Sequence, residues 1–367
     1  MSMSLDGLNI SLLKKLTIII PTFNRQMFMV RSMEYWSGKH VNIIYIDGSK
    51  KPLNSSYLTN IKSNIKYIHK SGSIYERLFS IISLIDTEFV MLGCDDEFYI
   101  PKVLNSCLVR LSLDSHLVSC MGIAIGFNWY NNSVVGYHVY NKLNGLILND
   151  INPASRLIKH FSNYVPAHIY AVCRASIWKI AAKFIFSKEY NFFAAYEIQF
   201  ELILVYSGKS LVIKELMWMR SEECPPQYAT SKSLAPSLTL FKFWFDEKNS
   251  KEKEDFVART EAACKEINKL KKENYTINIK VPIETHLRPR KNLIFFIVYR
   301  NLPNFIRNLI KKIFKIFGND VTKKTPLINL TKSLEASGVA VDFKEIKIIE
   351  KKIISFYKNI KNFNLKF

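Results

Sequence analysis

The sequence predicts an α/β fold in which a mostly parallel sheet is covered by helices on both faces. Short apolar runs alternate with segments of helical pattern over the first hundred residues, which is the order that strand–helix–strand units produce. Each apolar run ends in turn residues such as Pro, Gly, Asn or Ser. The chain of 367 residues is long enough for one large domain and a further C-terminal region.

The elements can be assigned in order along the chain. Residues 16–20 predict a fully buried strand, which Pro21 ends. A helix is expected over residues 26–36, followed by strands over residues 41–46 and 65–68, a helix over residues 76–85 and a strand over residues 88–92. Ligands of such sheets bind beyond the carboxyl ends of the strands, so the polar segments that follow these strands are expected to line one edge.

The most informative segment is residues 91–98, where an apolar run ends in the adjacent carboxylates Asp95, Asp96 and Glu97. Close like charges repel each other and resist burial, so a cation is expected beside them. A hard divalent ion, Mg²⁺ or Mn²⁺, held by carboxylates and shared with a phosphate-bearing substrate, meets this need. The alternative is an acidic turn in which Asp95 or Asp96 caps a helix that begins at Pro101.

Taken together, residues 20–25, residues 46–49, Gly72 with Arg77, and residues 94–97 resemble the nucleotide-sugar half of GT-A glycosyltransferases. The similarity is to the family-two-like group of bacterial polysaccharide enzymes and spans about residues 16 to 225. It implies a GT-A fold, Rossmann-like with flanking helices, over residues 1–245. It also implies a metal-dependent, inverting transfer of a sugar from a nucleotide-sugar donor to a glycan or lipid-linked acceptor in surface polysaccharide synthesis.

The resemblance also implies a set of donor-site residues. Thr22, Arg25 and Asp47 would hold the nucleobase and ribose, Gly72 and Arg77 the donor phosphate or sugar, and Asp95 and Asp96 the metal. After strands expected at residues 210–213 and 216–219, Arg220 would reach the departing diphosphate, although an ordinary strand-end arginine is the alternative. The chain departs from the usual Asp-x-Asp-Asp form, because Gly93 stands in place of the first acid.

Sugar transfer with inversion needs a carboxylate that takes the proton of the acceptor hydroxyl. Glu197 and Glu201 are four residues apart, so a helix would place both on one face, with Glu197 nearer its positive end. The resemblance places the catalytic base in an acidic motif that opens a helix here, and we assign it to Glu197. The alternative is that both are solvated helix-face acids. His168 and Tyr170 lie in the region that lines the acceptor cleft in the family, although a lone histidine in an apolar strand is more often structural.

The formal net charge of +21 is concentrated in the C-terminal region, residues 246–367. Residues 288–318 hold eight basic residues and no acidic one, and the apolar positions from Phe305 to Phe317 follow a helical period. This pattern predicts an amphipathic helix on an anionic membrane surface. The alternatives are a helix that packs on the core and nucleic-acid binding, for which no recognition motif is present. Residues 252–273 predict an exposed, charged helix, and residues 346–360 a packing helix.

The remaining features predict a cytoplasmic enzyme at the inner face of the membrane. The six cysteines form no CxxC pair, and neither a signal-peptide core nor a run of eighteen apolar residues is present. Two other functions are compatible with the pattern. A nucleotidyl- or phosphosugar-transferase would use the same metal and phosphate edge. A non-catalytic glycan- or membrane-binding scaffold on a degenerate transferase fold is compatible with the missing acid at Gly93.

Overall fold

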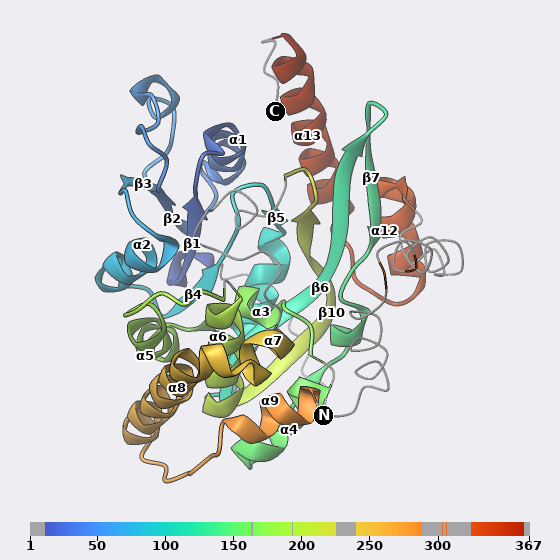
Figure 1. Ribbon diagram of the computed structural model, residues 1–367. Helices are drawn as coiled ribbons and strands as arrows, with labels where there is room; N and C mark the ends of the chain where they lie inside the picture. The colour runs from blue at the N-terminus through green and yellow to red at the C-terminus, as the bar shows by residue number, and fades with distance from the viewer. Residues whose placement is uncertain are drawn as a thin grey trace.

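The computed structural model describes residues 12–162, 164–192, 194–224, 240–287, 303, 306 and 324–362 (Figure 1). Its strands are β1 (Leu16–Thr22), β2 (Asn42–Asp47), β3 (Ile65–His69), β4 (Phe89–Leu92), β5 (Phe98–Tyr99), β6 (Leu117–Tyr130), β7 (Ser133–His138), β8 (Ile147–Leu148), β9 (Val172–Arg174), β10 (Lys209–Ser221) and β11 (Thr325–Pro326). Its helices are α1 (Gln26–Trp36), α2 (Ile74–Ser80), α3 (Pro101–Leu113), α4 (Pro153–Ser162), α5 (Ala175–Ile185), α6 (Ala195–Ser207), α7 (Leu240–Phe245), α8 (Ser250–Lys271), α9 (Lys280–Leu287), α12 (Leu327–Ala336) and α13 (Phe343–Asn362).

All these strands belong to one sheet, with the order β11-β7-β6-β9-β4-β1-β2-β3 and with β10 beside β6. Strands β4, β1, β2 and β3 are parallel, which confirms the predicted α/β class and its parallel sheet. The last residues of β1, β2 and β3 are level, because Thr22 pairs with Asp47 and Asp47 with His69, whereas β4 ends where Leu92 pairs with Ile19. Beyond β4 the sheet continues through the antiparallel strands β9, β6 and β7, which the sequence analysis does not predict.

Side chains of the buried strands alternate between two apolar cores, one on each face of the sheet. In β1, Ile18 and Ile20 lie in the first core and Ile19 in the second. Helices α1, α3, α12 and α13 cover the first core, and the second is covered by α2 and by α4 to α9. The apolar runs of β1 and β2 are continuous because both faces of the parallel strands are covered.

The described helices of the C-terminal region pack on these same cores. Phe256 and Ala263 of α8 are buried in the second core, and Ile346 and Ile349 of α13 in the first. The helix predicted over residues 252–273 is present, but the expectation that it is exposed is wrong, because one of its faces is apolar and covered. Figure 1 shows α13 beside β6, β7 and α1, with α8 and α9 at the opposite end of the molecule. The division into two domains at residue 245 stays a prediction.

Three further expectations concern local structure and the membrane. The helix predicted over residues 76–85 ends at Ser80 and is followed by a short 3-10 turn, Ile82–Leu84. Apart from Pro303 and Ile306, the segment 288–318 with its predicted amphipathic helix lies outside the described residues. In the part of the chain that is described, no helix combines the length and apolar character needed to cross a membrane.

Candidate active site

A cavity of about 340 Å³ lies at the carboxyl ends of the parallel strands. It is lined by residues from the turn after β1, the segment after β4, the first turn of α6 and the end of β10. These residues are Pro21, Arg25, Ile74, Leu92, Gly93, Cys94, Asp96, Glu97, Tyr140, Pro166, Tyr170, Tyr196, Glu197, Trp218, Arg220, Ser221 and Cys224. Five residues predicted for the site are therefore brought together here: Arg25, Asp96, Tyr170, Glu197 and Arg220.

Arg25 lies between the two adjacent aspartates at this edge. Its Nη2 donates to Asp95 Oδ1 at 2.5 Å, and its Nη1 donates to Asp96 Oδ2 at 3.2 Å. The other oxygen of Asp95 accepts a hydrogen bond from the Thr22 hydroxyl. Burial raises the pKa of Asp95 to about 7, although Arg25 opposes this shift. The cation expected beside the acidic cluster is thus supplied, at least in part, by the protein itself.

These contacts determine how a divalent ion would fit. Asp95 is fully buried and does not line the cavity, and both of its oxygens are hydrogen-bonded, so it does not fit as a direct metal ligand. Asp96 does line the cavity. Among the described residues, no three or more His, Cys, Asp or Glu side chains are grouped so as to hold an ion. Of the two predicted ligands, Asp96 therefore fits an ion of the Mg²⁺ type, which commonly takes one or two carboxylates and completes its shell with substrate phosphates and water.

Asp47 and Arg77 lie buried behind the strand ends rather than in the cavity. Asp47 accepts hydrogen bonds from Gln26 Nε2 at 2.6 Å and from the Tyr67 hydroxyl at 2.9 Å. Arg77 Nη1 donates to the carbonyl oxygens of Thr22 and Ile46, at 2.6 and 3.1 Å, and so joins the ends of β1 and β2. In this arrangement both side chains fix the shape of the edge on which a donor would lie.

Glycine is required at two positions near this edge. A Cβ at Gly48 would lie 2.6 Å from Arg77 Cζ, so any larger residue would displace the guanidinium from the strand ends. Gly72 has a φ of +118°, which an L side chain rarely adopts. It precedes the capping box of Ser73 and Glu76 that begins α2, and it does not line the cavity. Gly72 therefore shapes the turn before α2.

Glu97 is a cavity residue that the sequence analysis leaves without a role. Its Oε2 accepts hydrogen bonds from Trp218 Nε1 at 2.6 Å and from the Tyr99 hydroxyl at 3.0 Å. Burial, together with the neighbouring charge of Asp96, raises the pKa of Glu97 to about 8. The run of three acids contains a signal for this residue, but its contact with a tryptophan on the distant strand β10 is not visible in the sequence.

Glu197 lies in the first turn of α6, as predicted, and lines the cavity beside Tyr196. Burial raises the pKa of Glu197 to about 7, and Glu201 acts in the same direction, whereas the Tyr196 hydroxyl and Arg220 oppose it. A carboxylate with a pKa near ambient pH is well suited to accept a proton and release it again. The arrangement is therefore compatible with general-base chemistry at Glu197.

Glu201 and His168 belong to an internal network behind the cavity. Glu201 is fully buried, so the alternative of a solvated acid is wrong for this residue. His168 is expected in a strand but lies in a short 3-10 turn, His168–Tyr170, with a fully buried side chain. Its Nε2 is 2.9 Å from Ser119 Oγ, and it does not line the cavity. This placement matches the structural alternative for His168, whereas Tyr170 in the same turn does reach the cavity.

An aromatic cluster forms one wall of the cavity. The Trp218 ring stacks on Tyr140 at 5.5 Å between centroids and lies 4.9 Å from Tyr170. Arg220 Cζ lies 5.6 Å from the centre of the Tyr140 ring, and its Nη1 is 3.6 Å from Glu222 Oε1. The cavity thus combines two guanidinium groups, several carboxylates and flat aromatic surfaces, a set that suits an anionic ligand with a ring system.

Comparisons with known proteins give structural similarity only. No protein-family model matches the chain, and no curated protein matches it. The fold is similar to crystal structures of S. aureus TarS residues 1–349, with a TM-score of 0.42 at 12% identity over 70% of this chain and 82% of that one. The same protein in complex with UDP-GlcNAc gives a TM-score of 0.44 over 70% and 83%, and in complex with UDP 0.41 over 72% and 94%, both at 12% identity. At scores below 0.5 these similarities assign no activity to this chain. The functional assignment rests on the geometry of the site.

Proposed function

We propose that this chain is a glycosyltransferase that moves a sugar from a nucleoside-diphosphate sugar to a hydroxyl group of a glycan or lipid-linked acceptor. The observation that supports this most is the meeting of Arg25, Asp96, Glu197 and Arg220 in one cavity, although they come from distant parts of the sequence. Two arginines suit a diphosphate, and a half-buried carboxylate with a pKa of about 7 suits a hydroxyl that must lose its proton.

In this proposal, Arg25 and Arg220 bind the donor diphosphate through their planar guanidinium groups. Negative charge grows on the diphosphate as its bond to the sugar breaks, and the two cations stabilise that charge. Glu197 accepts the proton of the acceptor hydroxyl, whose oxygen attacks the anomeric carbon from the opposite face, so the configuration inverts. Asp96 would hold Mg²⁺ or Mn²⁺, which when bound adds positive charge next to the same phosphate oxygens.

A donor panel tests the proposal directly. UDP-, GDP- and dTDP-sugars, beginning with UDP-GlcNAc, are incubated with the protein with and without Mn²⁺, and the released nucleotide is identified. We expect one donor to yield its nucleoside diphosphate, and Glu197→Gln to abolish this release while UDP still binds in titration calorimetry. Released pyrophosphate would instead indicate nucleotidyl transfer. A protein that binds no nucleotide and turns over no donor would be a scaffold.

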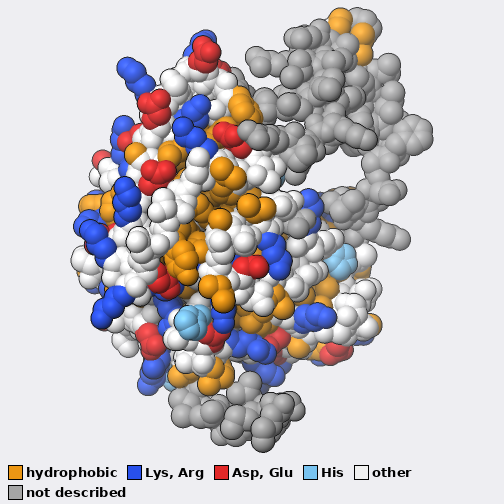
Figure 2. Space-filling view, turned by 90° about the horizontal axis from the view of Figure 1, so that it is seen from below, with side chains coloured by type: hydrophobic (Ala, Val, Ile, Leu, Met, Phe, Trp, Pro, Cys, Tyr) orange, Lys and Arg blue, Asp and Glu red, His pale blue; other side chains and the backbone are white. Residues whose placement is uncertain are grey.

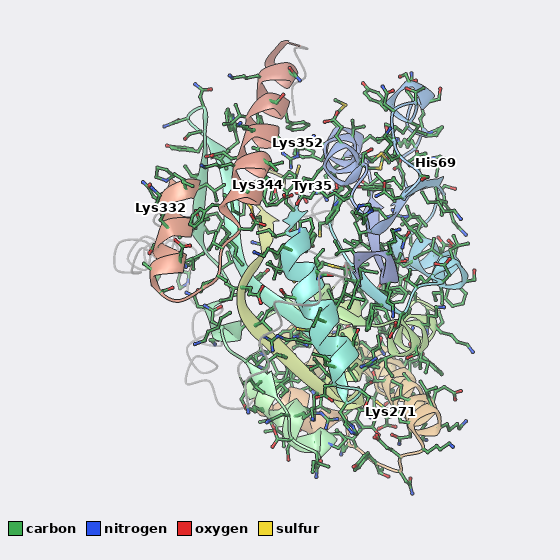
Figure 3. The ribbon with its side chains drawn as sticks, turned by 180° about the vertical axis from the view of Figure 1, so that it is seen from behind. Tyr35, His69, Lys271, Lys332, Lys344 and Lys352 are labelled. Atoms are coloured by element: carbon green, nitrogen blue, oxygen red, sulfur yellow. The ribbon has the colours of Figure 1, made fainter. Side chains whose placement is uncertain are left out.

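We also propose that the enzyme works at an anionic membrane surface. The net charge of +21 and the basic segment 288–318 support this. On the described helix α13, the exposed residues include Lys344, Lys347, Lys351 and Lys358 but no carboxylate. Figure 3 shows Lys344 and Lys352 on α13, with Lys332 on α12 on the same side of the molecule. Figure 2 shows that Lys and Arg side chains are also spread over the end of the molecule opposite α13, around a band of hydrophobic side chains.

Vesicle flotation separates the basic segment from general charge. In the full chain, Arg307, Lys311, Lys312 and Lys315 are changed to Gln, and vesicles of phosphatidylglycerol and phosphatidylcholine are compared with phosphatidylcholine alone. Each basic residue near an anionic surface contributes about 1 kcal/mol, so this variant should lose most of its binding. The control changes the exposed lysines Lys251, Lys265, Lys269 and Lys272 around α8 to Gln, which removes the same charge. Equal flotation of all three proteins would rule out a membrane role for the segment.

A further inference from the structure

The carboxylate of Glu201 connects helix α6 to the turn beside it. Its Oε1 accepts hydrogen bonds from the backbone N–H groups of His168 at 2.9 Å and Ile169 at 3.3 Å. Its Oε2 lies 2.8 Å from His160 Nε2 on α4. The Glu201 side chain is fully buried, and the next residue of the turn, Tyr170, lines the cavity.

The network continues from this turn into the sheet. His168 Nε2 is 2.9 Å from Ser119 Oγ on β6, which is 2.8 Å from Ser210 Oγ on β10. Strand β10 carries Trp218, whose ring contacts Tyr170. One buried set of polar groups therefore joins α6, α4, the turn and two strands, and three of these five elements also supply cavity residues.

Burial of such a polar network costs more free energy than burial of apolar side chains in the same place. An apolar residue at position 201 would avoid the cost of burying a carboxyl group, and replacement of buried polar clusters by apolar side chains is often neutral or stabilising. The groups that face Glu201 are His160, His168, Tyr164 and, one turn earlier, Glu197. Burial lowers the pKa of His160 to about 4 and that of His168 to about 3, so neither imidazole supplies a positive charge at pH 7.

What the network provides is a fixed distance between two walls of the cavity. Glu197 and Glu201 are one turn apart on α6, and the bonds from Glu201 to the His168 and Ile169 amides set where Tyr170 lies relative to that helix. We propose that Glu201 is a positioning residue, whose buried carboxyl group holds the turn with Tyr170 at the place that Glu197 requires. The inference rests on the proposed function, because it concerns the alignment of an acceptor with the base.

Two conservative variants separate the geometry of Glu201 from its charge. Glu201→Gln keeps the length of the side chain, an oxygen for the two amides and a group that can donate to His160. Glu201→Asp keeps the carboxyl group but is one methylene shorter, so it cannot reach the turn and His160 together. The matched control is Gln199→Leu, which removes a fully buried polar group of the same helix that bonds to Phe256 and Thr260 of α8 instead of the turn.

The first measurement needs no substrate. Hydrogen–deuterium exchange of peptides covering residues 166–171 should be as slow in Glu201→Gln as in the wild type, and at least about tenfold faster in Glu201→Asp, because the amides lose their acceptor. In Gln199→Leu these peptides should exchange as in the wild type. Unchanged exchange in Glu201→Asp would overturn the inference, whatever the enzyme is found to catalyse.

The second measurement uses the donor that the panel identifies. Glu201→Asp should lower kcat by about 10- to 100-fold with an unchanged affinity for UDP, because a misplacement of about 1 Å has this effect. Glu201→Gln should keep the kcat of the wild type. Equal losses of kcat in Glu201→Asp and Gln199→Leu would reduce Glu201 to a stabilising role and overturn the inference. A wild-type protein with no turnover of any donor would refute the proposed function, and the exchange result would stand separately.

Discussion

At the scale of single residues, the site shows how the fold tolerates several buried acids in a small space. Arg25 pairs with the negative charges of Asp95 and Asp96, and Trp218 donates a hydrogen bond to the carboxylate of Glu97. Asp95, Glu97 and Glu197 all have raised pKa values because burial disfavours their charged forms. A cation bound beside these groups would favour their charged forms and so release protons near neutral pH.

Arg25→Met should destabilise the protein strongly. It leaves Asp95 and Asp96 without their guanidinium, and breaking a buried ion pair from one side costs about 3 to 5 kcal/mol. Urea unfolding at pH 7 measures this loss. Arg220→Met is the control, because the side chain of Arg220 is 35% exposed and its pair with Glu222 is expected to contribute about 1 kcal/mol at most. Equal unfolding midpoints of the two variants would contradict the role of Arg25.

The pH dependence of turnover should follow Glu197. A general base must be ionised, so kcat/KM should rise with pH and reach half its maximum near the pKa of Glu197, about 7. Initial rates between pH 5.5 and 8.5 at saturating metal measure this profile. A rate that is constant over this range would exclude Glu197 as the base.

The raised pKa of Glu197 also predicts a loss of stability with rising pH. The folded state holds this proton up to pH of about 7, whereas the unfolded chain releases it near its ordinary value of 4.5. The stability due to this group is therefore complete below pH 4.5 and is lost as pH rises through 7. The decrease in unfolding free energy from pH 5 to pH 8 should be smaller in Glu197→Gln than in the wild type. Equal decreases in the two proteins would contradict this assignment.

Five of the residues predicted for the site line the cavity. The other predicted residues lie near it, but the sequence does not show that their side chains point elsewhere. The order of strands and turns predicts that Thr22, Asp47, Arg77 and Asp95 lie at one edge of the sheet, but not how deep each side chain lies. Depth depends on contacts across the sequence, such as Arg77 with the Ile46 carbonyl. The prediction that His168 contacts the acceptor fails for the same reason. Its partner Ser119 lies on a strand that no local pattern indicates.

At the scale of elements, the local pattern is a good guide to the first four strands and to the helix between the first two of them. Helix α1 has the predicted bounds of 26 and 36, and β1 to β4 lie within two residues of prediction. Strands β6 and β7 are not predicted, because their antiparallel pairing and the pairing of β6 with the distant β10 depend on long-range contacts. The segments predicted at residues 210–213 and 216–219 are one long strand, β10, with register shifts between them.

Helix α1 is tied to α13 and to the site through Arg31. Its Nη2 donates to Glu223 Oε2 at 2.6 Å and to the Asp96 carbonyl oxygen at 2.8 Å, and its Cζ is 4.6 Å from the centre of the Phe356 ring. This one side chain thus contacts the acidic loop, the segment after β10 and the last described helix.

Arg31→Met should therefore cost about 3 to 5 kcal/mol, since Glu223 would stay buried without its partner. The double variant with Glu223→Met should recover part of this loss, because both charges are then absent. Urea unfolding of the two single variants and the double variant measures the coupling, and strictly additive losses would show that the two side chains do not act as a pair.

At the scale of the whole molecule, the C-terminal helices complete the cores. Arg259 of α8 donates to the carbonyl oxygens of Phe184 and Ile185 at the end of α5, and Ile346, Ile349 and Ile353 of α13 are fully buried. Burial of one such isoleucine stabilises a fold by about 1.5 to 3 kcal/mol. The net stability of a whole domain is only about 5 to 15 kcal/mol.

A protein that ends at residue 245 should therefore be unstable, because it would lack α8 and α13. Circular dichroism and thermal unfolding of residues 12–245 against the full chain measure this, with residues 12–362 as the control. A cooperative unfolding transition in the shorter chain would support the predicted division into two domains.

The position of α13 has a consequence for the synthesis of the protein. Proteins are made from the N-terminus, and early segments begin to fold while later ones are still on the ribosome. The parallel strands leave first, together with α1 and α3, but the part of the first core that α12 and α13 cover stays open until these two helices have followed. Such a nascent chain exposes apolar surface to which chaperones bind. A stalled or prematurely terminated product should therefore aggregate rather than persist as a smaller folded protein.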